Sequence, residues 1–231
     1  MIYVHIGAGA GDQDSGANFR DGFTEFVKQS NDIKKEIYVV EANPSNISKL
    51  KLTWINYPKV KIFNFAISTK ENEKIKFYYS LDDAPHYQVF SNDINHILKY
   101  YKDLKKIKNK LIFSKHINIF LEENFKNKII NYFSIDIEGM DFKVIKEIDL
   151  NKYKIINFSF EHLHLNFIEK TQLFTKFLKN GYSYNGVGID HNNYDWSFKK
   201  GINIWNNLIF LVIILISKKH YKYLDKLLLK F

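Results

Sequence analysis

The chain has 231 residues, 45% apolar and 26% charged, a balance typical of one globular domain and not of a disordered segment. It has no cysteine, which excludes disulfides and thiolate metal sites. The net charge is +9, but Arg20 is the single arginine, and lysine lacks the planar fork that reads nucleic acid bases, so nucleic acid is a disfavoured partner.

Short β-branched or aromatic runs alternate with amphipathic stretches, the pattern of crossover connections in a mostly parallel sheet. It predicts an α/β fold. We expect strands at Ile2–Ile6, Glu36–Glu41, Val60–Ala66, Tyr132–Asp136, Ile155–Glu161 and Trp205–Ile214. We expect helices at Phe19–Ser30, Pro44–Leu52, Phe142–Ile148 and Thr171–Leu178.

Residues 80–118 break this rhythm with a polar cluster, DDAPHYQVFSND, and a lysine-rich run, KYYKDLKKIKNK. We interpret them as a partly helical insertion over the strand ends, where α/β sheets bind substrates. The catalytic domain is then predicted to span residues 1–216, with the insertion over its active site. Residues 217–231 form a predicted amphipathic helical tail, which could pack on the domain, on a second subunit or on an anionic membrane surface.

Two further features bear on location. The chain enters its first apolar run at Ile2 without the basic and long apolar regions of a signal peptide, so we expect a cytoplasmic protein. The longest apolar run, residues 208–216, is too short for a spanning helix, which needs about 20 residues. The oligomeric state is left open.

The stretch YVHIGAGAGD, residues 3–12, carries three closely spaced glycines after the first predicted strand. It lacks the Gly-Lys-Ser/Thr ending of a phosphate loop, and Asp12 stands where a dinucleotide fingerprint needs its third glycine. An acid there suits a ligand with a positive group, such as the α-amino group of S-adenosylmethionine. The carboxylate of that molecule can meet backbone N–H donors in the same turn.

A second strand, in IYVVEANP, ends in Glu41. Its carboxylate can accept both hydroxyls of an adenosine ribose. Because neighbouring parallel strands end at the same edge of a sheet, Glu41 and the glycine turn are expected to lie together.

Four segments, VHIGAGAGD, VVEANP, FNFAIS and FSIDIEGMDFKVIKEID, together resemble the FkbM-type S-adenosylmethionine-dependent methyltransferases. In order they resemble the cofactor turn, the ribose-binding strand end, the adenine-side strand and the signature after the fourth strand. The likeness covers residues 2–216, and Asp136–Asp141, a D-x-E-G-x-[DE] segment, is its most specific part. It implies a Rossmann-like class I methyltransferase with a mostly parallel seven-stranded sheet flanked by helices.

The resemblance also implies a set of cofactor-binding residues. Gly7, Ala8, Gly9 and Gly11 would lie against the methionine part, Glu41 and Ala42 at the ribose, and Ala66 and Ile67 near the adenine. Family members usually carry an acid two residues before the first glycine, where this chain has His5. The contact with the amino group then passes to Asp12 or Asp136.

Two strand ends supply the candidate catalytic residues. Asp136 and Glu138 can orient a hydroxyl, accept its proton or hold a divalent metal, and one of them can instead merely cap the next helix. His162 in NFSFEHLHL is the candidate base for the acceptor, while His164 could be an ordinary surface residue. No helical His or Glu spacing supports a metal site, so the metal dependence is left open.

The function expected from the resemblance is methyl transfer from S-adenosylmethionine to a hydroxyl of a sugar or of a glycan or capsule precursor in polysaccharide biosynthesis. An amine, a carboxylate or a phosphate-type oxygen is an alternative acceptor, and His86, Tyr87 and Ser91 are candidate acceptor contacts. The rival interpretations are a lysine-rich protein that binds or modifies nucleic acid and a non-catalytic partner at a membrane.

Overall fold

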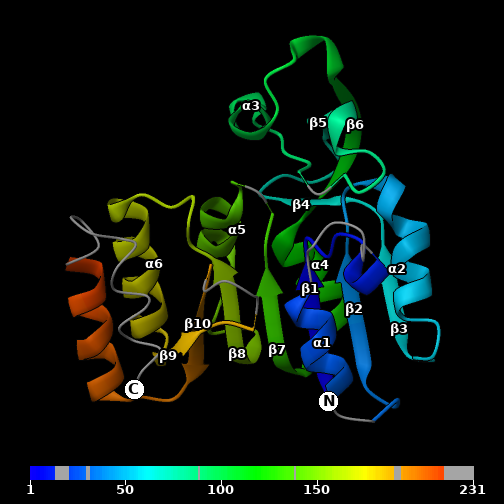
Figure 1. Cartoon of the computed structure of the whole chain (residues 1–231). Helices are drawn as coiled ribbons and strands as arrows, with labels where there is room; N and C mark the ends of the chain where they lie inside the picture. The colour runs from blue at the N-terminus through cyan, green and yellow to red at the C-terminus, as the bar shows by residue number, and fades with distance from the viewer. Residues whose placement is uncertain (14–20, 30–31, 88, 138, 190–193, 216–231) are drawn as a thin grey trace.

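The computed structural model describes residues 1–13, 21–29, 32–87, 89–137, 139–189 and 194–215 (Figure 1). Its centre is a seven-stranded sheet in the order β3-β2-β1-β7-β8-β10-β9. These strands are β1 (Ile2–Ile6), β2 (Glu36–Val40), β3 (Val60–Phe63), β7 (Ile129–Ile135), β8 (Lys154–Glu161), β9 (Tyr182–Val187) and β10 (Asp195–Lys200). Strands β3, β2, β1, β7 and β8 pair in parallel, and β10 runs antiparallel to both of its neighbours. The predicted mostly parallel seven-stranded sheet is confirmed.

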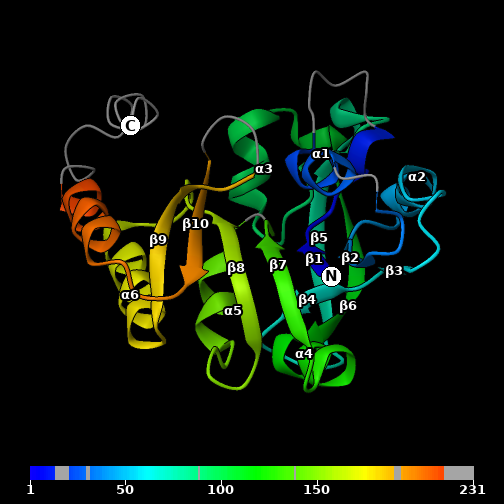
Figure 2. The same ribbon diagram turned by 90° about the horizontal axis from the view of Figure 1, so that it is seen from below.

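Helices cover both faces of the sheet (Figure 2). On one face lie α1 (Gly22–Gln29) and α2 (Ile47–Thr53), and on the other lie α4 (Ile117–Phe125), α5 (Asp141–Glu147) and α6 (Phe167–Lys179). Their apolar stripes bury Val27, Leu50, Phe120, Val144 and Phe177 against the strands. Short 3-10 helices occur at Gly11–Gln13 (η1), Pro44–Asn46 (η3), Leu81–Asp83 (η4) and Leu104–Lys106 (η5).

The order of the strands fixes where a ligand can bind. From β1 the chain continues to β2 on one side, whereas β7 lies on the other side. In open α/β sheets, the crevice at the carboxyl ends of strands that diverge in this way is the usual ligand site. The crevice between β1 and β7 is therefore the place to examine.

The insertion stands over the carboxyl ends of the strands (Figure 1). It is built on a second sheet, β4-β6-β5, with β4 (Ala66–Ser68), β5 (Lys74–Ser80) and β6 (Ile107–His116), and it also carries α3 (Ile94–Tyr100). The insertion was expected to be partly helical, and α3 agrees with that. However, the sequence pattern did not predict β5 and β6, and the segment Val60–Ala66 is divided between the two sheets. Lysines mask the apolar alternation of β6, where Ile112 is buried between the exposed Leu111 and Phe113.

The prediction of a strand at Trp205–Ile214 is wrong, because residues 204–215 form a helix. Its β-branched residues favour a strand, but the buried positions Asn207, Phe210 and Ile214 recur with the spacing of a helix. The last two strands of the sheet are instead β9 and β10. Among the described residues, no helix has both the length and the apolar character to cross a bilayer. The predicted tail, residues 217–231, lies outside the described residues.

Candidate active site

A cavity of about 480 Å³ lies at the carboxyl ends of β1, β2, β7 and β8, beneath the insertion. Its walls contain most of the predicted cofactor residues, namely Gly7, Ala8, Gly9, Gly11, Glu41, Ala42, Ala66, Ile67 and Asp136. Aromatic side chains complete the lining, namely Phe77 from β5 and Tyr87, Phe90, Tyr100 and Tyr101 from the insertion. The two halves of the sheet and the insertion thus meet around one space, which is large enough for a nucleoside-sized ligand.

The three glycines of the turn are required for different reasons. All of them have positive φ, which favours glycine. A Cβ on Gly7 would lie 1.5 Å from the backbone oxygen of Asp136, and one on Gly11 would lie 2.7 Å from the Thr53 side chain. A Cβ on Gly9 would meet nothing within 4 Å. Gly7 and Gly11 therefore allow protein segments to pack closely, and only Gly9 leaves room on the cavity side.

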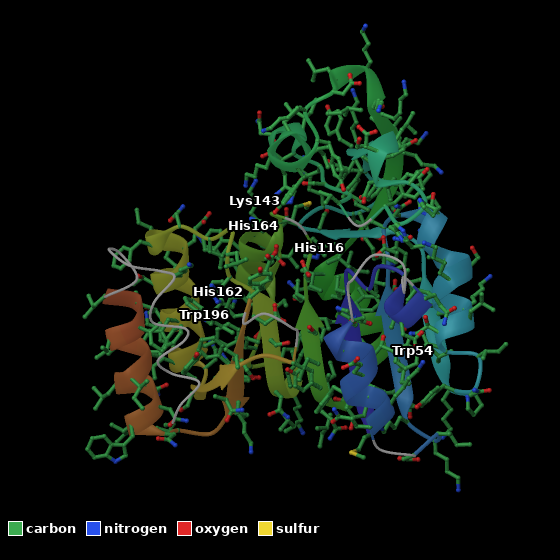
Figure 3. The ribbon with its side chains drawn as sticks, viewed as in Figure 1. Trp54, His116, Lys143, His162, His164 and Trp196 are labelled. Atoms are coloured by element: carbon green, nitrogen blue, oxygen red, sulfur yellow. The ribbon has the colours of Figure 1, made fainter. Side chains whose placement is uncertain are left out.

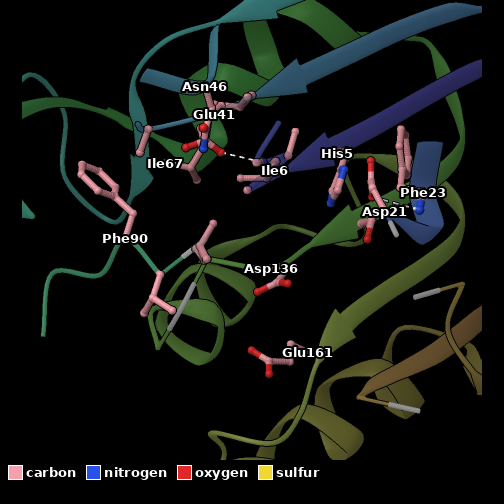
Figure 4. Close-up of a pocket in the computed structure, with 18 of the residues that line it drawn as sticks. His5, Ile6, Asp21, Phe23, Glu41, Asn46, Ile67, Phe90, Asp136 and Glu161 are labelled. Carbon is pink, nitrogen blue, oxygen red and sulfur yellow. Dashed lines mark hydrogen bonds between the residues drawn. The ribbon is translucent and has the colours of Figure 1, made fainter. Parts of the chain in front are cut away.

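The carboxylate of Glu41 is held in place at the end of β2 (Figure 4). Its Oε2 accepts a hydrogen bond from Gly9 N at 2.7 Å, and its Oε1 accepts one from Asn43 N at 2.6 Å. Glu41 is only 6% exposed, yet it lines the cavity. The two backbone N–H groups fix the orientation of this carboxylate, and a carboxylate oxygen is the kind of acceptor that a ribose hydroxyl binds. This geometry fits an adenosine ligand.

Asn46 adds a second polar group on this wall. Its side chain is 3% exposed, and its Oδ1 has no hydrogen-bond partner among the described residues. A buried amide oxygen in that state is costly unless a ligand or a water satisfies it. Ala66 and Ile67 of β4 supply the nearby apolar surface that a purine ring needs.

The end of β7 forms the opposite wall, with Asp136 in the cavity lining. Asp141 braces the loop that follows, because its carboxylate accepts hydrogen bonds from Ile137 N at 3.0 Å and Gly139 N at 3.2 Å. Burial, and then the nearby charge of Glu161, raises the pKa of Asp141 well above its usual range. Glu138, a predicted catalytic residue, lies outside the described residues. Within this motif, Asp141 therefore shapes the loop and Asp136 faces the ligand space.

The end of β8 brings a carboxylate and an imidazole together. The Nε2 of His164 lies 3.2 Å from Oε2 of Glu161, and both residues line the cavity. The His164 ring also makes an edge contact with the ring of His96 from α3, with 4.6 Å between centroids. His164, which the sequence left as a surface alternative, is therefore placed between the strand end and the insertion.

The geometry does not bring His162 to the cavity. Its ring stacks on Trp196 with 4.2 Å between centroids, and the residue is 1% exposed (Figure 3). His162 follows Glu161 directly, so alternation along the strand directs it away from the side that Glu161 faces. The chain then turns at residues 163 and 164, which brings His164 to the cavity wall beside Glu161. Among the candidate acceptor contacts, Tyr87 lines the cavity, whereas His86 and Ser91 do not.

Asp12 is not part of the cavity lining either. Its carboxylate pairs with Lys28 Nζ at 2.5 Å. Partial burial raises the pKa of Asp12, but hydrogen bonds from Lys28, Gln13 and Thr53 outweigh it and hold that pKa below its usual value. Asp12 thus ties the turn to α1.

A buried acid that the sequence pattern missed, Asp21, does line the cavity. It caps α1 by accepting hydrogen bonds from Phe23 N at 3.2 Å and Thr24 N at 3.3 Å. Burial raises the pKa of Asp21 to about 6, against the effect of these bonds. The Phe23 ring packs on His5 with 4.5 Å between centroids, so Asp21 stands near the position where His5 replaces the usual acid. Its position before a helix was the available signal.

Among the described residues, no group of at least three His, Cys, Asp or Glu side chains is arranged to hold a metal ion.

Most of this site falls within one family match. Residues 6–184 match the family model described as the methyltransferase FkbM domain, and this range is most of the chain. The chain belongs to the FkbM methyltransferase family. The family suspected from the four motifs is confirmed, and with it a Rossmann-like class I fold and an S-adenosylmethionine-dependent methyltransferase.

The other comparisons add little to this FkbM assignment. A ribosomal protein L11 methylase from Lactobacillus delbrueckii subsp. bulgaricus matches with a TM-score of 0.37 and 6% identity, over 87% of this chain and 70% of that chain. A SAM-dependent methyltransferase from Aquifex aeolicus matches with a TM-score of 0.37 and 9% identity, over 86% and 80%. No curated protein matched the sequence.

Proposed function

We propose that this FkbM methyltransferase transfers the methyl group to a neutral hydroxyl of a sugar or glycan precursor, with His164 as the general base. The observation that carries the proposal is the Glu161–His164 pair in the cavity lining. Glu161 lies on the same side of the cavity as Asp136 and across from Glu41 (Figure 4). S-adenosylmethionine, when bound, supplies an electrophilic methyl group, so the protein must position the acceptor and remove one proton.

The charge of the cavity argues against an anionic acceptor. Its described lining contains the carboxylates of Asp21, Asp136, Glu161 and Asp195 and no lysine or arginine. An anionic acceptor, such as a carboxylate or a phosphate, would be repelled there. The carboxylates can instead accept hydrogen bonds from several hydroxyls, and the aromatic side chains of the insertion offer flat apolar surface. Both features suit a sugar.

The Glu161 carboxylate lies beside the His164 imidazole. A carboxylate 3.2 Å from Nε2 favours the proton on that nitrogen, so Nδ1 is the basic atom of the imidazole. As the new carbon–oxygen bond forms and the carbon–sulfur bond breaks, the hydroxyl proton passes to His164. Glu161 then stabilises the resulting imidazolium. General-base catalysis of this kind contributes about 10²–10⁴-fold in rate.

The decisive experiment measures methyl transfer from labelled S-adenosylmethionine to neutral mono- and oligosaccharides, with a simple amine and a carboxylic acid as comparison acceptors. His164→Asn should lower kcat by about 100-fold or more and leave cofactor affinity unchanged. His162→Asn is the matched control, because that residue is close in sequence but outside the cavity lining. Transfer to the amine alone, or equal kcat values for the two variants, would contradict the proposal.

A further inference from the structure

The helix of residues 204–215 carries a large apolar face that no described residue covers. It lies at the outer edge of the molecule, beside α6 and β9, in both views (orange-red in Figures 1 and 2). Its inner side is anchored by Phe210, Ile213 and Ile214, which are buried in the main core. Its outer side exposes Ile204, Trp205, Leu208, Leu211, Val212 and Leu215, each by more than a third.

This face runs the length of the helix, since its residues recur at intervals of three and four. Trp205 is 77% exposed, whereas the other two tryptophans, Trp54 and Trp196, are at most 2% exposed. Single exposed apolar residues are common on protein surfaces, but a contiguous stripe marks an interaction site. The hydrogen bonds of Asn206 and Asn207 with Tyr184 fix the stripe to β9, facing outward.

The charge around the stripe indicates its partner. From residue 196 to residue 224 the sequence has no Asp or Glu, and it has five lysines, two just before the helix and three just after it. An exposed apolar helix face with a terminal tryptophan and flanking lysines has the chemistry of an interfacial anchor for an anionic bilayer.

We infer that the face of helix 204–215 docks on an anionic membrane surface, with its apolar side chains in the acyl boundary and the flanking lysines at the headgroups. This inference does not depend on the acceptor or on the general base. A second copy of the chain would bring the same lysines face to face, which opposes docking of two such faces. The chain's own last residues would add more lysines to a region that already has an excess of them.

The test uses the full chain and vesicles of phosphatidylcholine, with or without about one third phosphatidylglycerol. Because Trp205 is the exposed tryptophan, its emission should shift to the blue and be quenched by brominated lipid only with the anionic vesicles. Leu208→Gln/Val212→Gln should lower the partition coefficient by about tenfold or more, and Lys199→Glu should lower it and its salt dependence. Leu52→Gln/Ile55→Gln, two exposed apolar residues at the other edge of the sheet, is the matched control and should bind as wild type.

Three results would overturn the inference. The first is equal flotation of the Leu208→Gln/Val212→Gln variant and the wild type. The second is Trp205 emission that is already shielded from acrylamide without vesicles, which would show that another part of the chain covers the face. The third is a dimer in light scattering that the same double variant converts to a monomer, which would assign the face to a second copy.

Discussion

At the scale of single residues, the glycine turn separates a packing requirement from a ligand requirement. Gly7 lies against the backbone of Asp136, so a side chain there would have to move β1 and β7 apart. Gly9 borders the cavity, and its N–H holds Glu41. Gly7 and Gly9 therefore look alike in the sequence pattern, but Gly7 is needed for packing and Gly9 for the ligand space.

We predict that Gly7→Ala mainly impairs stability and that Gly9→Ala mainly impairs cofactor binding. Gly7→Ala should lower the free energy of unfolding by about 3 kcal/mol or more, because a backbone atom blocks the Cβ. Gly9→Ala should cost only about 1–2 kcal/mol, for a left-handed alanine, but should weaken cofactor binding, since its Cβ enters the ligand space. Urea unfolding and calorimetric titration measure the two quantities. Equal losses of stability would contradict the assignment of roles.

Asp21 gives a prediction on pH. A carboxyl whose pKa is higher in the folded protein than in the unfolded chain binds more protons when folded, so its stabilising contribution is complete below about pH 4 and is lost as pH rises through about 6. Asp21→Asn should therefore gain stability relative to wild type, on the order of 1–3 kcal/mol, between about pH 4 and pH 7. Asparagine keeps the helix cap. Urea unfolding of both proteins at the two pH values checks the sign, and a constant difference would show that Asp21 does not titrate in this range.

At the scale of secondary structure elements, a stack of aromatic rings joins the last strands to their helix. Phe160 of β8, Phe177 of α6 and Phe198 of β10 lie with their rings within 8° of parallel, and their centroids are 4.4 to 5.8 Å apart. All three side chains are fully buried. The stack orders the half of the sheet that presents Glu161.

Phe177→Ala should lower the free energy of unfolding by about 3–5 kcal/mol, because it removes a fully buried ring that packs on both Phe160 and Phe198 and leaves a cavity. Leu178→Ala, the next residue on α6 and 41% exposed, is the control and should change stability by less than about 1 kcal/mol. Thermal or urea unfolding compares them. Similar losses in the two variants would mean that the stack contributes little.

The sequence predicted those elements whose local pattern agrees with their place in the fold. β1, β2, β7 and β8 are buried on both faces, so they appear as apolar runs ending in polar residues. Helix 204–215 was misassigned because it is apolar all round, which hides its period of 3.6. Strands β5 and β6 were missed because one sheet face is exposed and rich in lysine, and their pairing joins residues far apart in sequence.

The site follows the same rule. Glu41 and Asp136 could be found because each ends a strand with a recognisable pattern. The sequence does not rank Asn46, Asp21 and His164 as site residues, because their place in the site depends on burial and on neighbours in the folded protein. A sequence pattern alone also does not separate His164 from His162. The amino-group contact stays a prediction, with Asp136 and Asp21 in the lining as its candidates.

At the scale of the whole molecule, we expect the cofactor to contact both halves of the sheet and to stabilise both. At about 100 times its dissociation constant, S-adenosylmethionine should add about 2.7 kcal/mol and raise Tm by about 5–10 °C. Glu41→Ala should abolish most of this shift, while Glu36→Ala, at the opposite end of β2, should retain it. Thermal scans with and without cofactor measure this shift in Tm. A full shift in Glu41→Ala would show that Glu41 does not contribute to cofactor binding.

The small sheet β4-β6-β5 contributes residues to two parts of the cavity lining. β4 provides Ala66 and Ile67 beside the expected adenine. Phe77 of β5 stacks on Phe90, and both rings line the cavity on the side expected for the acceptor. Ala66, Phe77, Phe90 and Ile112 share one hydrophobic cluster. A nucleoside that binds against β4 should therefore also order the Phe77 and Phe90 side chains that cover the cavity. We expect ordered sequential kinetics, in which the methyl donor binds before the molecule that it modifies.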